Sequence, residues 1–566
     1  MKSFKTRHAF FAASLAVALG VFAFACGSNE DVPPVCEGAA CVDAGGPESS
    51  TAEGSTNDGP GADAPGDAPT EGGDAGACKL EAADADAGPS GTLQWALNFG
   101  VSGYTTARAV ALDPKDGDIV VVGSLFGSVD FGGGVLVSQA ADASASDVFV
   151  ARFTSAGVYK WAKAFGNGFL ASPIGVAVDN SGVVSVGGSF RGASLDFGGG
   201  PLARVGSNDL FIVSLDAAGA YRWAKSFGTA NNTQILNSVA VDPSGNVLIG
   251  GLADALDFGG GARSGFYIAK FTASGTHSWS KAFSVGNPIG NPTLAADQQG
   301  NAVLAGAFTG AVDFGAGALA SSGGGTAFVA KFDPSGAYQW AKVFAAVPAI
   351  PTAIAESRVS SGGLSTDACG NLFLAGDFGA STGETSLSFG GPPLVAPDLA
   401  GASNAFLAKL TPAGAGVWSK SFLGTNNNMT TNGRLLMGSA AGGGASGPTI
   451  SASLLGSNMF GDQESVNFGG GVLTNSGEGS LAVAAFGETG AHRWSYVGGA
   501  PSTARRSSPA AAKAVAASAS AVVLIGDFGT CPTTCTNSPP GTTLVLAGQT
   551  LTATSARDMV LVSFAR

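Results

Sequence analysis

The segment that decides the fold reads Asp147-Val-Phe-Val-Ala-Arg-Phe-Thr-Ser-Ala-Gly-Val-Tyr-Lys-Trp-Ala-Lys-Ala-Phe165. Two runs rich in β-branched and aromatic residues flank residues 154–157, a turn of small residues that ends in glycine. Such runs around a short glycine-containing turn predict a β-hairpin. The first run, 147–153, is apolar at nearly every position, which indicates a strand that is buried on both faces.

This hairpin returns along the chain, and a tryptophan marks each copy. The seven tryptophans are spaced by 66, 62, 56, 61, 78 and 76 residues: Trp95, Trp161, Trp223, Trp279, Trp340, Trp418 and Trp494. A second hairpin, built on an Asp-x-x-Gly turn, lies between them at 176–188, 239–251, 294–306 and 364–376, with a longer form at 109–123. Regular spacing of this kind indicates an internal repeat.

Four short strands per repeat predict an all-β fold, a seven-bladed β-propeller of four-stranded antiparallel blades. We name the strands of a blade a to d, with strand a at the Asp-x-x-Gly hairpin and strand d at the tryptophan. The predicted domain, residues 92–566, begins with a d strand at 93–99 and ends with a c strand at 558–566. Pairing of these two strands would close the ring and remove two exposed edges. The sixth blade lacks the Asp-x-x-Gly turn, so six or eight blades remain alternatives.

The first 25 residues predict a secretory signal peptide. Basic residues at positions 2, 5 and 7 precede an apolar run of 17 residues, 9–25, which is too short to cross a bilayer. The run ends Ala23-Phe-Ala-Cys-Gly27, which resembles a bacterial lipobox with Ala23 where leucine is usual. The resemblance implies an acylated, palmitate-carrying Cys26 as the first mature residue, anchored at the outer membrane of the cell envelope. Ordinary cleavage before an unmodified Cys26 is the alternative.

Residues 26–91 predict a disordered acidic tether that follows the anchor. Residues 27–91 hold 14 acidic residues and one lysine among small and polar residues, with little apolar content to drive folding. Cys36, Cys41 and Cys78 could form a disulfide loop there, with the pairing open, and no histidine accompanies them to bind zinc. Most of the net charge of −13 belongs to this tether. The near-neutral remainder argues against a nucleic-acid partner.

The repeated carboxylates allow two interpretations. Segments of the type Asp-Phe-Gly-Gly-Gly begin at Asp130, Asp196, Asp257 and Asp313, with Ser388 and Asn467 at the equivalent places. Calcium needs six or more oxygen ligands, which one carboxylate per blade does not supply. Glycine and Asp suit a tight chain reversal. We therefore expect turns and no metal site.

Histidine and lysine give no catalytic pattern. His277 and His492 lie two residues before a tryptophan, where other repeats carry Tyr159, Tyr221 and Tyr338, so we interpret them as planar packing residues. One lysine per repeat lies two residues after the tryptophan, which predicts a solvated ladder or, alternatively, an anion-binding ring: Lys163, Lys225, Lys281, Lys342 and Lys420. Cys531 and Cys535 predict a local disulfide in an insertion, and Cys369 a lone thiol.

The full repeat resembles a known family. The unit Ala-Val-Asp-x-x-Gly-Asn, then Asp-x-Phe-x-x-Lys, then Gly-x-x-x-Trp-x-Lys is similar to the seven-bladed propeller repeat of secreted and lipid-anchored bacterial proteins, which implies a fold and an extracytoplasmic location but no common activity. The segment Gly336-Ala-Tyr-Gln-Trp340 also resembles the tryptophan-docking motif of quinoprotein propellers. Their extended cofactor and calcium motifs are missing, so we expect no cofactor.

These patterns favour a non-catalytic, monomeric binding or scaffolding module of the cell envelope, held to the membrane by its lipid anchor. Its partner would be an envelope protein or a glycan, bound by residues that the sequence does not identify. The d–a and b–c loops, which share one face, vary most, at 228–234, 345–363, 424–433 and 498–513. The alternative is a hydrolase or lyase for an extracellular polymer, with acids or a histidine converging on a central channel.

Overall fold

The computed structural model describes residues 91–100, 102–139, 145–230, 234–322, 324–397, 404–426, 434–442, 447–455, 464–475, 480–499, 511–529, 543–554 and 557–566. The chain divides into two compact units, Met1–Asp74 and Ala75–Arg566, and every described residue belongs to the second. Several predicted features lie outside the described residues: the signal peptide, nearly all of the tether, the predicted lipidation site Cys26, and the cysteines Cys531 and Cys535.

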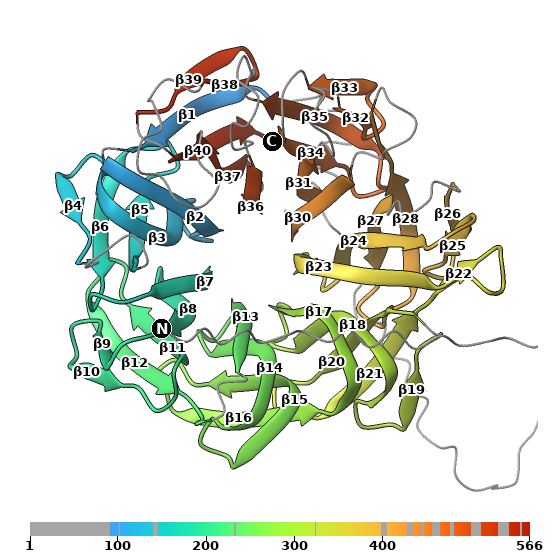
Figure 1. Cartoon of the computed structure of the whole chain (residues 1–566), viewed down its shortest axis with the longest axis horizontal. Helices are drawn as coiled ribbons and strands as arrows, with labels where there is room; N and C mark the ends of the chain where they lie inside the picture. Colours follow the sequence, from blue (N-terminus) through green and yellow to red (C-terminus); the bar gives the residue numbers. More distant parts are fainter. Residues whose placement is uncertain are drawn as a thin grey trace, which may run out of the picture. The chain divides into compact units, whose positions relative to one another are not determined.

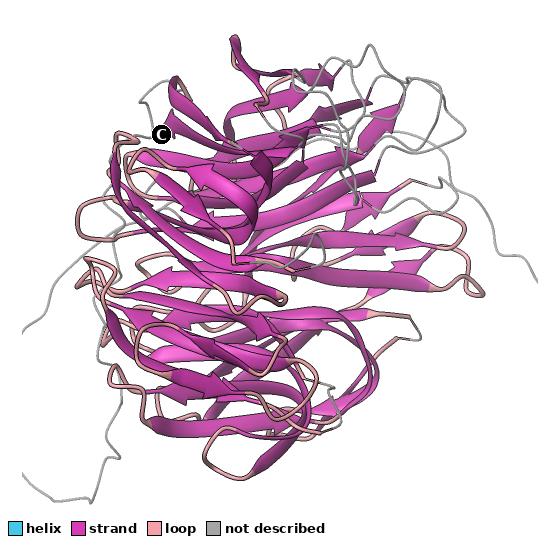
Figure 2. Cartoon of the chain, turned by 60° about the vertical axis from the view of Figure 1, so that its left-hand side comes forward, coloured by secondary structure: helices cyan, strands magenta, loops and turns pink. Residues whose placement is uncertain are grey.

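The described residues form strands and turns without any helix, which confirms the all-β prediction (Figure 2). It follows that this part of the chain contains no apolar helix of membrane-spanning length. The fifth strand, β5 (Asp147–Phe153), is buried along its whole length, as the apolar run at 147–153 predicts.

The predicted repeat of four antiparallel strands is present, and we name each blade by its a strand. In the order a to d, the blades are β2 (Ser102–Leu112), β3 (Ile119–Asp130), β5 and β6 (Tyr159–Phe165); β7 (Ala171–Val178), β8 (Val184–Phe190), β11 (Asp209–Leu215) and β12 (Tyr221–Phe227); β13 (Ile235–Val241), β14 (Val247–Asp257), β15 (Ala262–Phe271) and β16 (His277–Phe283); β17 (Val285–Ala296), β18 (Ala302–Asp313), β20 (Thr326–Phe332) and β21 (Tyr338–Phe344); β23 (Ala355–Thr366), β24 (Leu372–Ala380), β27 (Asn404–Leu410) and β28 (Gly416–Phe422); β30 (Arg434–Gly442), β31 (Pro448–Leu455), β34 (Ser480–Phe486) and β35 (His492–Gly499); and β36 (Ala511–Ala517), β37 (Ala521–Gly529), β40 (Arg557–Ala565) and β1 (Leu93–Phe99).

Shorter strands occupy the connections between blades and between strands b and c. They are β4 (Val135–Val137), β9 (Ser194–Asp196), β10 (Pro201–Ala203), β19 (Ala318–Ala320), β22 (Ala346–Pro348), β25 (Thr385–Leu387), β26 (Leu394–Ala396), β29 (Gly424–Asn426), β32 (Glu464–Asn467), β33 (Val472–Asn475), β38 (Thr543–Leu546) and β39 (Gln549–Thr552). Strand β22 lies on a d–a connection and pairs with β25 on a b–c connection, and β29 pairs with β32 in the same way. The two connection types therefore share a face, as the strand order predicts.

The blades are arranged around a common centre with their a strands innermost, the architecture of a β-propeller (Figure 1). Each a strand contacts the a strand of the next blade, and β36 contacts β2. Strand β1 pairs antiparallel with β40, in a register that runs from Leu93 opposite Phe564 to Phe99 opposite Met559. The β36 blade thus takes its d strand from the beginning of the domain.

The tryptophans join neighbouring blades. Six indoles lie on the positive-φ glycine of the next c–d turn, at Gly157, Gly219, Gly275, Gly336, Gly414 and Gly490. The seventh, Trp494, lies on Gly91, a positive-φ glycine just before β1. Six indole N–H groups donate to a turn carbonyl of that next blade, at distances of 2.8 to 3.2 Å. Trp494 Nε1 has no hydrogen-bond partner among the described residues. The reason is that β40 and β1 are joined by strand pairing instead of a c–d turn.

Pairs of phenylalanines form a second layer between blades. The last residue of a d strand packs against the phenylalanine that follows the repeated Asp, Ser or Asn, with ring centroids 4.8 to 5.3 Å apart. The pairs are Phe99–Phe131, Phe165–Phe197, Phe227–Phe258, Phe283–Phe314, Phe344–Phe389 and Phe422–Phe468. Large aromatic areas are therefore buried between blades as well as within them.

Replacement of one internal tryptophan is predicted to destabilise the whole domain. Trp223→Ala removes an indole that packs on Gly275 and donates to the Ala273 carbonyl at 3.0 Å. Because the Trp223 indole is half-buried, the free energy of unfolding, measured by urea denaturation, should fall by less than the roughly 3–5 kcal/mol that deleting a fully buried large aromatic costs. Trp223→Phe, which keeps part of the apolar contact, should lose less. An unchanged unfolding midpoint for Trp223→Ala would contradict a packing role.

Candidate functional site

The repeated carboxylates cap turns, as the sequence predicts. Asp130 Oδ1 accepts the backbone N–H groups of Gly132 and Gly134 at 2.7 and 3.1 Å. Asp196, Asp257, Asp313 and Asn467 make the same pair of bonds, and Ser388 makes one of them. These N–H donors lower the pKa of Asp257. Within the described residues, no group of three His, Cys, Asp or Glu side chains is placed to hold a metal ion.

The two histidines are packing residues of these turns. A Cβ built on Gly260 or Gly470 would lie 2.7 or 2.2 Å from the ring of His277 or His492, and one on Gly133 would meet the Tyr159 ring in the same way. Burial lowers the pKa of both imidazoles, which favours their neutral form. The interpretation as planar side chains at a repeat position is confirmed.

The repeated lysines do not converge. They lie one per blade on the d strands, which are the outermost strands of the blades (Figure 1). In the salt bridges between described residues, none of Lys163, Lys225, Lys281, Lys342 and Lys420 takes part. The arrangement is that of a solvated ladder and does not form an anion-binding ring.

Four carboxylates at the c strands and beside the a strands are buried. Asp147, Asp209 and Asp558 begin c strands, are at most 1% exposed and accept N–H groups of the loop before them. Burial raises the pKa of Asp147. Asp527 is fully buried beside the a strands, where it accepts the Ala107 N–H at 2.8 Å, and burial raises its pKa. These four carboxyl groups hold loops and strands in place and are closed to a substrate.

The state of Cys369 differs from the expectation. The sequence predicts a lone thiol, whereas this cysteine is disulfide-bonded. It lies in the turn after β23, where Asp367 Oδ1 accepts its N–H at 2.9 Å. The other six cysteines, including Cys36, Cys41 and Cys78, lie outside the described residues.

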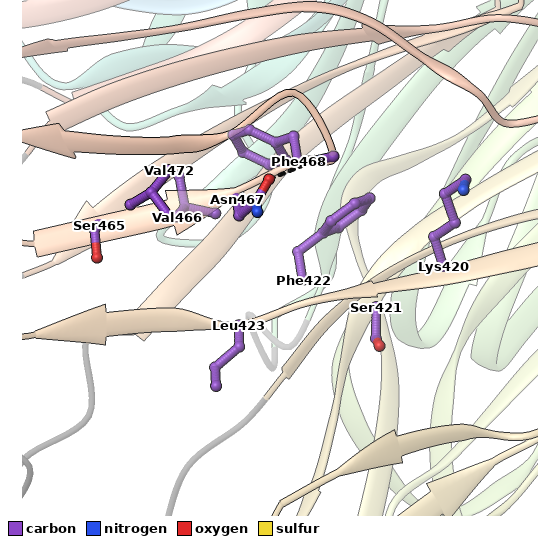
Figure 3. Close-up of a pocket in the computed structure, with 10 residues that line it drawn as sticks. Lys420, Ser421, Phe422, Leu423, Ser465, Val466, Asn467, Phe468 and Val472 are labelled. Atoms are coloured by element: carbon purple, nitrogen blue, oxygen red, sulfur yellow. Dashed lines mark hydrogen bonds between the residues drawn. The ribbon is translucent and has the colours of Figure 1, made fainter.

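An open pocket of about 520 Å³ lies between the β23 and β30 blades (Figure 3). One wall is the end of β28, from Lys420 to Leu423, and the other is the β32–β33 hairpin with Val466, Phe468 and Val472. Its floor is apolar because Phe422 and Phe468 pack together with ring centroids 5.3 Å apart. Lys420 is the only charged residue among the side chains that line it.

An apolar row lies on the same stretch of the outer rim. Val347 on β22 and Val395 on β26 are both paired with Ser386 on β25, so their side chains share one face of this small sheet. Val347 is 59% and Val395 47% exposed, and the d–a connection adds the exposed Ile350 and Ile354. Strand β26 also contacts β28, which bears Lys420. We call the pocket and this row together the rim surface.

The sequence indicated part of the rim surface. Three of its exposed residues, Val347, Ile350 and Ile354, belong to the variable loop at 345–363. Val395 and the pocket were not predicted. A signal was nevertheless present, because the longest tryptophan spacings, 78 and 76 residues, belong to the two blades that carry the additional strands β22, β29 and their partners. Of the other variable loops, 231–233, 427–433 and 500–510 lie outside the described residues.

Comparison with known proteins identifies no family. No protein family model matches the chain, and no curated protein matches it. Among solved structures, a chain of the mitotic checkpoint complex is 10% identical with a TM-score of 0.37, over 79% of this chain and 93% of that one. The Dos1 propeller is 9% identical with a TM-score of 0.36, over 83% and 94%. The WD40 domain of SCAP from fission yeast is 10% identical with a TM-score of 0.22, over 70% and 95%. Because all three scores are below 0.5, nothing about function is transferred from them.

Proposed function

We propose that residues 92–566 form a seven-bladed propeller whose ring is closed by the pairing of β1 with β40. Two repeated features support this. The tryptophan joints form a cycle, in which Trp95 on β1 packs on Gly157 of the β2 blade and Trp494 packs on Gly91 beside β1. The contacts between a strands also run around the same cycle, from β2 to β36 and back to β2.

We propose that this domain is a non-catalytic binding or scaffolding module that acts as a monomer and recognises an envelope protein or glycan. The observation that carries this proposal is the rim surface, which combines exposed β-branched side chains with a pocket that has an apolar floor and one lysine. Contiguous exposed apolar side chains on a soluble domain mark sites of association. The four buried carboxylates and the two packed histidines described above make structural contacts.

We further propose that Cys26 carries lipid and holds the domain at the outer membrane through the acidic tether. The support is in the sequence: a short apolar run, small residues before the cysteine and an acidic, apolar-poor segment after it. Several acyl chains on one residue give firm attachment without a spanning helix. The like charges of the tether favour an extended chain, which would hold the propeller away from the membrane.

Ring closure predicts that the last strand is essential. Deletion of residues 558–566 removes the partner of both β37 and β1 and exposes an edge on each of them. The truncated domain should aggregate or unfold, as measured by light scattering and by far-UV circular dichroism on heating. A truncated domain with the spectrum and thermal midpoint of the parent would exclude closure by these strands.

Lipidation predicts a single labelled residue. In bacteria grown with a fatty acid that carries a click-reactive group, the full chain should incorporate the label. Cys26→Ala should incorporate none, because the thiol that forms the thioether is missing. Cys369→Ala serves as the control and should be labelled like the parent. Equal labelling of the parent and Cys26→Ala would contradict the proposal.

Charged substitutions on the rim surface are predicted to abolish binding of the partner. The double variant Val347→Asp and Val395→Asp places two carboxylates on the apolar row, where a partner would have to desolvate them. Pull-downs from envelope extract should lose partners that the parent retains. Val137→Asp alters an exposed valine on β4, in the β2 blade, and should retain them. Identical captures by the parent and the double variant would move the binding site elsewhere, and thermal midpoints would confirm that both variants are folded.

A further inference from the structure

Buried lysines bridge consecutive blades at a repeated position. Lys270 on β15 lies 2.9 Å from Asp242 Oδ2 in its own a–b turn and donates to the Pro334 carbonyl of the next c–d turn at 3.2 Å. Lys331 on β20 repeats this geometry with Asp297 Oδ2 at 2.8 Å and the Pro412 carbonyl at 3.3 Å. Both lysine side chains are 4% exposed. Each carboxylate therefore has a cation beside it, inside the joint.

Two further blades also place a cation beside the aspartate of the a–b turn. In the β23 blade, Lys409 lies 3.6 Å from Asp367 Oδ2 and also pairs with Glu488 of the next blade. In the β2 blade, Arg152 pairs with Asp113 and Asp118 and donates to the Gly182 carbonyl of the next blade at 3.0 Å. A cation thus stands at this place in the β2, β13, β17 and β23 blades, whereas the β30 and β36 blades carry Ala485 and Ser563 there.

The β7 blade breaks the rule twice. Ser214 occupies the lysine position, since it lies opposite Trp223 as Lys270 lies opposite Trp279. Val183 also stands where other blades have a second donor, four residues after the aspartate. In the β13 blade this residue is Asn246, whose Nδ2 donates to Asp242 Oδ2 at 2.8 Å. Asn301 and Asn371 do the same in the next two blades. Asp179, the aspartate of the β7 blade, lacks both donors.

The oxygens around the missing ammonium group remain in place. Asp179 is 7% exposed, and its Oδ1 caps the turn by accepting the N–H groups of Ser181 and Val183. No donor within the described residues bonds to its Oδ2. Ser214 is 1% exposed, and its Oγ has no hydrogen-bond partner there. The Ala273 carbonyl accepts the Trp223 N–H at 3.0 Å and stands where the Pro334 carbonyl accepts both an indole and a lysine.

Charge and access define what fits between these oxygens. Asp179 lines a small pocket, and one positive charge would balance its carboxylate. A divalent ion would need more carboxylates than this joint offers. A pocket of about 100 Å³, lined by Asp179, Asp242 and Asp297, opens beside Asp179 and gives a small ion a path to it. Asp242 and Asp297 are already paired with Lys270 and Lys331, so among the described residues Asp179 is the carboxylate of this pocket that has no cation beside it.

We propose that the joint between the β7 and β13 blades binds one monovalent cation, an alkali metal ion or ammonium, between Asp179 Oδ2 and the Ala273 carbonyl oxygen, at the place that the shorter Ser214 side chain does not reach. The ion takes the place of the lysine ammonium group of the following blades. It neutralises Asp179 and ties two blades together at a point where the chain supplies no cation of its own. The site is independent of the rim surface and of whatever the rim surface binds.

The first test compares thermal midpoints in sodium, potassium, ammonium and tetramethylammonium chloride at equal ionic strength. The parent should melt at a higher temperature in at least one of the three small cations than in tetramethylammonium, because a ligand that binds only the folded state raises stability with its concentration. Ser214→Lys supplies the missing ammonium group and should lose this difference. Asp179→Asn, which removes the charge, should lose it too and guards against misfolding of the lysine variant.

A matched control separates this site from general salt effects. Ser278→Lys adds a lysine at an exposed position on β16 and should retain the cation dependence of the parent. Equal midpoints of the parent in all four salts would overturn the proposal, as would a cation dependence that persists undiminished in both Ser214→Lys and Asp179→Asn.

The second test locates the ion directly. Crystals of the parent soaked in rubidium or thallium salt should show an anomalous peak within bonding distance of Asp179 Oδ2, and crystals of Ser214→Lys should show none. A water molecule at this place in the parent under the same soak would overturn the proposal.

Discussion

The fold depends on the packing of each tryptophan against the glycine of the next c–d turn. A four-stranded blade is apolar on both faces, so it cannot bury itself and is stable only between neighbours. The indole supplies a large apolar area and an N–H group that satisfies a turn carbonyl of the adjacent blade. Glycine is required because a Cβ on Gly275 would lie 2.7 Å from Trp223 Cδ2, and because φ is +83° there. One interaction thus fixes the spacing, the turn and the order of the blades.

A repeat this strict leaves function to the departures from it. Asp130 and its equivalents accept hydrogen bonds from glycine N–H groups within their turns. The tyrosines and histidines beside these turns pack against the same glycines. The β23 and β30 blades differ, because their connections are long enough to form small additional sheets on the rim. Among the described residues, Val347 and Val395 on the small sheet of β22, β25 and β26 are exposed. A rigid ring thereby presents a surface that can change in sequence without cost to the core.

The polar interior obeys the same logic in the joints. A buried aspartate of the a–b turn serves twice, since one oxygen caps the turn and the other meets a cation from the c strand. The first role is local and is met in the β7 blade by Ser181 and Val183 N–H groups. The second role depends on a residue 35 positions away, Ser214, and on the next blade. Without the second role the turn still forms, but Asp179 has no cation beside it among the described residues.

The sequence by itself determined the all-β class, the four-stranded unit, the turn role of the Asp-Phe-Gly-Gly-Gly segments and the packing role of His277 and His492. Each of these follows from strand periodicity, turn chemistry or position within the repeat. Only the tertiary structure decided which residues of distant segments become neighbours. Val347 and Val395 form one row because β25 pairs with both β22 and β26, and Cys369 is bonded instead of free. Asp179 lacks a cation because blades that are alike in sequence pattern differ at two positions that meet only in the folded joint. Local patterns encode elements, whereas charge balance and exposed surface are properties of contacts between them.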